Sequence, residues 1–347
     1  MKKFISLLLI LALAVPFFAA CNGNNGNGET TTLPEASSDA TAPEATPDSE
    51  LEIKVTVLSG TTGMGMAKLM SEKKNGNAAL NYNFSVVSDA TAVAPLVISG
   101  QTDIAAVPTN LASTLYKRTE GGIYVLAINT LGVLYLLENG ETVTDINSLK
   151  GKTVYVPGSG TNPEYILQYV IEANGMTVGE DVIFDYTYST PDALAQAATA
   201  GLAGIALLPE PKVTVVKNNN SAIRTAIDLT AEWEKVAPKG SLAQGCVIVR
   251  KEFADAHPAE VQKFLEEYKA SVNFVNDSKE EAATLIAEAG IIPQAPLALK
   301  AIPNCNITYV DGEAMKSALT VFYRNLFNIN PASIGGAIPA DDIYYVK

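Results

Sequence analysis

The alternation of apolar and polar positions becomes regular from residue 51 onwards. Residues 51–58 alternate as a strand with one buried face, residues 59–63 form a turn of serine, glycine and threonine, and a helical pattern then runs to residue 70. The same order of strand, short polar turn and helix recurs twice up to residue 116, and another strand follows at 123–129. Alternating strands and helices with short connections predict an α/β fold with helices on both faces of the sheet.

The same order starts again after a connector at 142–149. A strand at 153–156 is followed by a second glycine-rich turn at 157–161 and a helix at 163–173. The remaining elements are expected as strands at 182–188, 204–208 and 244–250 and as helices at 192–200, 258–276, 279–289 and 312–326. The pattern therefore predicts a second α/β lobe, with the late strand at 244–250 able to return to the first.

A different pattern precedes this body. Two lysines are followed by an apolar run at 4–18, which is too short for a membrane-spanning helix of about 20 residues and is typical of an export signal. Small residues stand directly before Cys21, and this resembles the lipobox of bacterial lipoproteins, although Phe18 stands where leucine is usual. We expect residues 1–20 to be a signal peptide and Cys21 to be lipidated, with simple cleavage of the signal as the alternative.

Residues 22–49 consist largely of Asn, Gly, Thr, Ser, Pro, Ala and acidic residues without periodic apolar positions. Such a segment cannot form a core, so we expect residues 21–50 to be the lipidated cysteine and a flexible tether. Several acyl chains on Cys21 would hold the protein on a membrane, because each buried methylene contributes about 0.8 kcal/mol.

Composition narrows the possible functions. A chain of 347 residues suits two lobes, and 48% hydrophobic against 18% charged residues is typical of a compact globular protein. The net charge of -13 includes no cluster of Lys and Arg that could neutralise phosphates, which argues against nucleic acid as a partner. The single histidine, His257, argues against a histidine-rich zinc site or a His-based triad and is expected to be a surface or capping residue. We expect no metal and no cofactor.

Two cysteines and the only tryptophan leave alternatives open. Cys246 and Cys305 could form a disulfide in an exported chain, but they lie far apart in sequence and apolar residues surround Cys246. Buried free thiols are therefore expected, with a bridge as the alternative. For Trp233 we expect core or surface packing, with a stacking wall for a ligand ring as the alternative.

Two glycine-rich turns, 60–63 and 158–161, each lie between the carboxyl end of a strand and the first turn of a helix. Unpaired N–H groups and the positive end of the helix dipole are exposed there, and glycine lets a ligand approach closely. Capping explains one such turn equally well, but the recurrence favours two polar edges across a cleft. Neither turn carries a dinucleotide or phosphate-loop signature. Glu210, between two prolines, either contacts ligand or only shapes its turn.

The ordered set of motifs resembles the substrate-binding proteins of ABC importers. The resemblance is to the group named for thiamine-pyrimidine synthesis proteins (NMT1/THI5-like), related to the aliphatic-sulfonate and nitrate binders. The matching segments are residues 60–70, 100–110, 149–155, 207–211, 302–307 and 334–336. The resemblance implies the periplasmic-binding-protein type II fold, in which each lobe has a mixed, mostly parallel sheet flanked by helices. The crossovers are expected near 130–134 and 242–245, with lobe I at 51–131 plus 244–347 and lobe II at 132–243.

The resemblance also implies a function. Two lobes close on a small molecule by a hinge motion. The protein is then expected to be a monomer tethered to the outer face of the membrane, where it delivers that molecule to an ABC permease with its ATPase subunit. It is not expected to be an enzyme. By position, the pocket loops map onto Gly60, Thr61, Thr62, Gly63, Met64, Ser88, Asp89, Thr109, Asn110, Asn129, Thr130, Gly158, Ser159, Gly160, Thr161 and Glu210. One departure is Lys212, where relatives often place an aromatic residue.

The mapped loops contain Thr, Ser and Asn but no Arg, so the forked contact of a guanidinium with a carboxylate or sulfonate is missing. A neutral or mildly polar, pyrimidine-like heteroaromatic ligand is therefore favoured, with a small sulfonate or nitrate-type anion held only by helix N-termini as the alternative. Competing functions are an exported enzyme of the same fold acting on a pyrimidine or cofactor precursor, and an adhesive or sensory lipoprotein with a broad apolar patch.

Overall fold

The computed structural model describes residues 46–346. The predicted signal peptide, Cys21 and almost all of the predicted tether lie outside the described residues. Within the described part, no helix is both long enough and apolar enough to cross a membrane.

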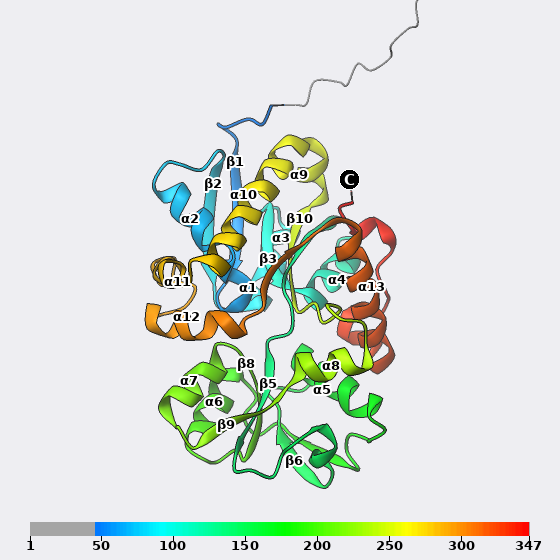
Figure 1. Cartoon of the computed structure of the whole chain (residues 1–347). Helices are drawn as coiled ribbons and strands as arrows, with labels where there is room; N and C mark the ends of the chain where they lie inside the picture. Colours follow the sequence, from blue (N-terminus) through cyan, green and yellow to red (C-terminus); the bar gives the residue numbers. More distant parts are fainter. Residues whose placement is uncertain (1–45, 347) are drawn as a thin grey trace, which may run out of the picture. The chain divides into compact units, whose positions relative to one another are not determined.

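The first half of the described body is built on a six-stranded sheet with the order β11-β4-β10-β3-β1-β2 (Figure 1). Its strands are β1 (Glu52–Leu58), β2 (Asn81–Val87), β3 (Ile104–Pro108), β4 (Ile123–Thr130), β10 (Gly245–Arg250) and β11 (Ile307–Val310). Its helices are α1 (Thr61–Met64), α2 (Ala67–Lys74), α3 (Val93–Ile98), α4 (Thr109–Arg118), α9 (Lys251–Ala256), α10 (Pro258–Asp277), α11 (Lys279–Glu288), α12 (Ala295–Ala301) and α13 (Gly312–Ile329).

The second half is built on a five-stranded sheet with the order β7-β6-β8-β5-β9. Its strands are β5 (Leu134–Asn139), β6 (Lys152–Tyr155), β7 (Val182–Asp185), β8 (Ile205–Pro209) and β9 (Ile223–Asp228). Its helices are α5 (Asn162–Ala173), α6 (Pro191–Thr199), α7 (Lys212–Asn219) and α8 (Leu229–Val236). The predicted α/β class is therefore confirmed, and so is the return of the late strand β10 to the first sheet.

Continuous apolar strands are explained by helices on both faces of each sheet. In β10, Cys246 and Ile248 pack into one hydrophobic cluster with α3, α4 and α13, whereas Val247 and Val249 pack into a second with α2, α10 and α11. Successive side chains of a strand point to opposite faces, so a strand that helices cover on both faces is apolar at successive positions. The five-stranded sheet repeats this arrangement, with α5 and α8 on one face and α6 and α7 on the other.

Both sheets are mixed, as predicted, and most strands of each run in one direction: four of six in the first sheet and four of five in the second. In the first sheet β1 pairs in parallel with β2 and β3, but β10 runs antiparallel between β3 and β4. In the second, β5 runs antiparallel to both β8 and β9. Both β5 and β10 arrive from the other half without an intervening crossover helix, so each begins at the edge where its neighbours end.

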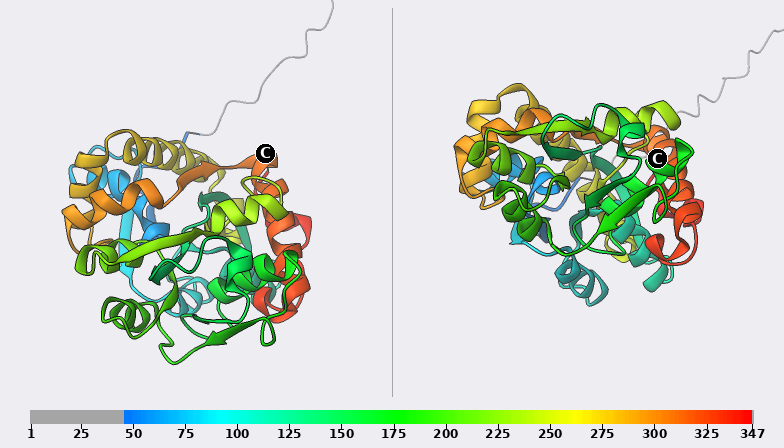
Figure 2. Two further views of the ribbon diagram at one scale, coloured as in Figure 1. Left: turned by 60° about the horizontal axis from the view of Figure 1, so that its bottom comes forward. Right: turned by 90° about the horizontal axis from the view of Figure 1, so that it is seen from below.

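Two crossovers join the halves. The first is the three-residue segment 131–133 between β4 and β5, and the second leads from α8 to β10. The two are bonded to each other, because the backbone N–H of Val133 donates to the side-chain carbonyl of Gln244 at 2.7 Å. Figure 2 shows a further connection, in which α13 of the first half lies against α5 of the second. The exact lobe boundaries at 131/132 and 243/244 stay a prediction.

The two cysteines and the tryptophan all lie in the core. Cys246 and Cys305 are buried and free, and burial raises the pKa of the Cys246 thiol to about 12. Trp233 is fully buried and donates its indole N–H to the Ser241 hydroxyl at 2.9 Å, with the Tyr169 ring 4.5 Å away. The free-thiol and core-packing predictions are therefore confirmed, and a ligand-stacking role for Trp233 is not available.

Gly63 provides a test of the packing between β1 and α1. A Cβ atom at this position would lie 2.2 Å from the carbonyl oxygen of Leu58 and 2.8 Å from a methyl group of Val57. Overpacking of this kind typically costs about 1–3 kcal/mol, so Gly63→Ala should lower the free energy of unfolding by at least that amount in urea titrations. Gly204→Ala is the matched control, because no atom lies within 4 Å of its added Cβ; equal losses in both variants would contradict the packing argument.

Candidate functional site between two sheet edges

The carboxyl ends of the strands gather at one edge of each sheet. In the first sheet Leu58 pairs with Val87, and Gly245 pairs with both Pro108 and Thr130. In the second, the same edge carries the ends of β6, β7, β8 and β9 beside the start of β5. Only three residues separate Thr130 from Leu134, so near this crossover the two edges lie within about 15 Å of each other. All the loops predicted to contact ligand lie at these two edges.

On the six-stranded side, side chains of the β4 end support the first glycine turn. The Asn129 amide donates to the carbonyl of Thr62 at 3.1 Å and accepts from the Thr130 hydroxyl at 3.0 Å. Asn129 and Thr130 are buried, as are Thr61 and Thr109. Gly60 has a φ of 97° and no atom within 4 Å of an added Cβ, so the turn itself faces open space.

The other predicted residues of this side differ in exposure. Met64 is fully buried in the core cluster beneath α1, so its side chain packs rather than faces a cleft. Ser88 and Asp89 are exposed, and Asp89 accepts from the backbone N–H of Thr91 at 2.8 Å. Asn110, the second residue of α4, is partly buried.

On the five-stranded side, the second glycine turn is held by its own hydrogen bonds. The Thr161 hydroxyl donates to the carbonyl of Gly158 at 2.9 Å, which closes the turn. The backbone N–H of Gly160 donates to the carboxylate of Glu164, which also accepts from the Tyr186 hydroxyl. Ser159 and Gly160 are exposed. The positive φ of 90° at Gly158 explains why glycine stands there.

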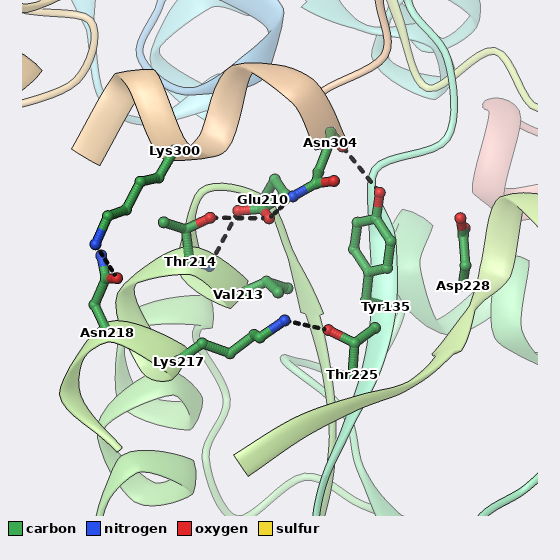
Figure 3. Close-up of a pocket in the computed structure, with 10 residues that line it drawn as sticks. All are labelled: Tyr135, Glu210, Val213, Thr214, Lys217, Asn218, Thr225, Asp228, Lys300 and Asn304. Carbon is green, nitrogen blue, oxygen red and sulfur yellow. Dashed lines mark hydrogen bonds between the residues drawn. The ribbon is translucent and has the colours of Figure 1, made fainter. Parts of the chain in front are cut away.

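Glu210 lies where β8 ends and α7 begins, and its side chain is only 2% exposed. The carboxylate accepts from the backbone N–H of Thr214 at 3.1 Å and from the Thr214 hydroxyl at 3.0 Å, so it caps α7. It also accepts from the amide of Asn304 at 3.3 Å, a residue of the other half (Figure 3). Both readings of Glu210 thus have support: it shapes the turn, and it faces a cavity.

This cavity has a volume of about 450 Å³ and lies between the two halves. Figure 3 shows Glu210 at its centre, below α12 and beside Tyr135. The lining residues are Tyr135, Glu210, Val213, Thr214, Lys217, Asn218, Thr225, Asp228, Lys300 and Asn304. Glu210 is the one predicted site residue among them, so the structure brings the other fifteen to the facing edges but not into this cavity.

The other nine residues that line this cavity are not among the site residues predicted from the sequence. The Tyr135 hydroxyl donates to the carbonyl of Asn304 at 3.0 Å, and the Lys300 ammonium donates to the side-chain oxygen of Asn218 at 2.9 Å. Both contacts join the two halves. A signal for Asn304 was present, since it lies in one of the segments that resemble the importer family. Tyr135 could not be found, because the strand that carries it was not predicted.

Neither the cavity lining nor the loops predicted to contact ligand include the single histidine of the chain. No group of three or more His, Cys, Asp or Glu side chains in the described part of the chain could hold a metal ion. His257 lies at the junction of α9 and α10, partly buried and 4.9 Å from the Phe253 ring. It occupies a helix-capping position, as predicted, away from both sheet edges.

Two mixed sheets with flanking helices, joined by two crossovers and facing each other with their loop-bearing edges, define the periplasmic-binding-protein fold. Residues 78–282, more than half of the chain, match the family model described as NMT1/THI5 like. The chain therefore belongs to the NMT1/THI5-like family. A search of curated proteins with the sequence finds no match.

Several solved structures share the fold of this chain. The crystal structure of an ABC transporter from Parabacteroides distasonis is 25% identical, and the alignment covers 86% of this chain and all of that one with a TM-score of 0.73. The periplasmic aliphatic sulphonate binding protein SsuA from Escherichia coli is 14% identical, with 83% and 92% covered and a TM-score of 0.65. A ligand-binding component of an ABC-type import system from Staphylococcus aureus is 15% identical, with 85% and 96% covered and a TM-score of 0.63.

The burial of Glu210 predicts a dependence of stability on pH. Burial raises the pKa of its carboxyl above the ordinary value of 4.5, against the opposing effect of hydrogen bonds from Thr214 and Asn304. A raised pKa in the folded protein means that the neutral carboxyl of Glu210 contributes to stability. This contribution is fully present below the ordinary pKa of 4.5 and is lost as the pH rises through the higher pKa of the folded protein. Relative to wild type, Glu210→Gln should therefore gain free energy of unfolding as the pH rises above the ordinary carboxyl pKa of 4.5.

The measurement is urea unfolding of both proteins across this range. Glu141→Gln serves as the control, because this substitution removes the same charge from an exposed side chain. A difference between wild type and Glu210→Gln that does not change with pH would show that burial does not control the charge state of Glu210.

Proposed function

We propose that the protein is an extracytoplasmic solute-binding protein of an ABC importer, which captures a small molecule between the two facing sheet edges. One observation carries the proposal. Polar turns from both halves, 60–63 with Asn129 and Thr130 on one side and 158–161 with Glu210 on the other, lie at edges that two short crossovers hold opposite each other. The crossovers would act as hinges, and closure would order these loops around the ligand.

The structural neighbours support this function. They are an ABC transporter structure, a sulphonate binding protein and a ligand-binding component of an import system. We therefore propose a small-molecule ligand and a permease with its ATPase subunit as partners, and we propose that the protein acts as a monomer without enzymatic activity. The residues proposed to contact ligand are those predicted from the sequence, except that Met64 contributes through packing beneath the turn.

Localisation follows from the N-terminal pattern and from the family together. We propose that residues 1–20 direct export and that Cys21 carries the lipid anchor, so that the folded body stands outside the cell or in the periplasm on a tether that ends near residue 50. Metabolic labelling with a palmitate analogue tests the anchor: Cys21→Ser should abolish incorporation, and retained label on that variant would remove Cys21 from the proposal.

The second glycine turn offers a test of the site. A Cβ at Gly158 would require a strained positive φ and would lie 3.0 Å from the carbonyl of Ser189. Gly158→Val should therefore displace the turn and reduce affinity for the physiological ligand by at least about tenfold, equivalent to about 1.4 kcal/mol. Gly179→Val controls for backbone strain, because its φ of 92° is similar but its surroundings are open. Equal affinity in both variants and wild type would remove this turn from the site.

The ligand for this experiment is found by native mass spectrometry of what co-purifies with the protein. Small-angle scattering with saturating ligand should show compaction, and the ligand should be recovered unchanged. Conversion of the ligand to a product would favour the exported enzyme instead, and binding without compaction would contradict closure of the two halves.

A further inference from the structure

Helix α5 starts directly after the second glycine turn, and its first turn contains an unusual hydrogen bond. Thr161 is the N-cap and Glu164 is the third residue of the helix. A glutamate at this position commonly bonds the N–H of the N-cap residue itself. Here the carboxylate reaches one residue further back, into the turn, and accepts from the backbone N–H of Gly160. The side chain therefore occupies an amide that an anionic ligand would otherwise use.

The environment of Glu164 strengthens this observation. Its side chain is 8% exposed, and its second oxygen accepts from the Tyr186 hydroxyl. No Lys or Arg among the described residues forms an ion pair with it. Its negative charge is therefore balanced only by neutral donors and by the N-terminal end of α5, and it acts at close range on anything that approaches the turn.

Two of the other three helices that begin at this edge, α7 and α8, are also capped by a carboxylate, whereas α6 is capped by the Thr190 hydroxyl. The amino end of α7 is capped by the carboxylate of Glu210, and that of α8 by Asp228, which accepts from the backbone N–H of Thr230 at 2.8 Å. The lysines that line the cavity, Lys217 and Lys300, bond to the neutral oxygens of Thr225 and Asn218 and do not pair with Glu164. At three of the four helix starts on this side, those of α5, α7 and α8, a backbone amide is thus already bonded to a carboxylate of the chain.

We infer that Glu164 determines the ligand class of the site, because its carboxylate fills the anion-binding position of the second glycine turn. The ligand that this edge accepts is a neutral or cationic molecule that donates hydrogen bonds, and sulfonates, sulfate and nitrate are excluded. The inference rests on the proposed function, since it concerns the same cleft, and it goes further by assigning the exclusion of anions to one side chain.

The experiment measures binding of methanesulfonate, sulfate and nitrate by calorimetry to the purified full chain and its variants. Wild type should show no saturable binding. Glu164→Gln, which keeps the size of the side chain but removes its charge, should gain saturable binding of sulfate or methanesulfonate, with a Kd at least about tenfold below the lower limit that the wild-type titration sets. Glu172→Gln is the matched control: it lies at the other end of α5, is exposed, and should behave as wild type does.

Two further variants cover the case in which the glutamine substitution disturbs folding. Glu164→Ala removes the carboxylate entirely and should gain anion binding, whereas Tyr186→Phe keeps the carboxylate and should continue to exclude anions. Circular dichroism confirms the fold of each. Tight binding of methanesulfonate by wild type, or no gain in folded Glu164 variants, would overturn the inference. A failure of the proposed function is distinguishable from a failure of this inference. In that case no ligand would co-purify and no compound would compact the protein, whatever the variants do with anions.

Discussion

The antiparallel insertion of β10 between β3 and β4 is the constraint on which the arrangement of the site depends. Because the chain enters the first sheet from the other half, β10 must begin where β3 and β4 end, with Gly245 opposite Pro108 and Thr130. β5 satisfies the same condition in the second sheet. These two strands place both loop-bearing edges at the crossovers, so the turns of one half meet those of the other without any long connecting segment.

The two edges differ in the side chains that accept hydrogen bonds from their turns and helix starts. On the six-stranded edge, neutral groups such as Asn129 and Thr130 bond to one another and to the glycine turn. On the five-stranded edge, Glu164 and Glu210 bond to the amides at the starts of α5 and α7. A buried carboxylate is tolerated there because helix N-termini offer donors that need acceptors. The buried polar side chains of the six-stranded edge are therefore neutral groups, whereas the five-stranded edge has buried carboxylates at its helix starts.

The difference between the two edges shows why a shared fold does not determine which ligand a protein of this fold binds. The chain shares its fold with a sulphonate binding protein at 14% identity, a similarity that fixes the positions of the loops but not the chemistry of their side chains. The predicted loops of this chain contain no arginine, and the five-stranded edge adds internal carboxylates. Ligand selection in such a scaffold can change through a few residues at helix starts, because the sheets and crossovers that position them stay the same.

The sequence by itself determined the α/β class, the two glycine turns, the return of the late strand and the family, because local periodicity and ordered motifs report on these features directly. Among the strands, it missed β5, β9 and β11. Residues 134–138 are all buried and show no alternation, and periodicity alone does not identify such a run. The direction of the two inserted strands, the packing of Met64, and the contact between Glu210 and Asn304 were decided only by tertiary structure. Each depends on which segments, distant in sequence, meet at the crossovers, and a linear pattern carries no information about that pairing.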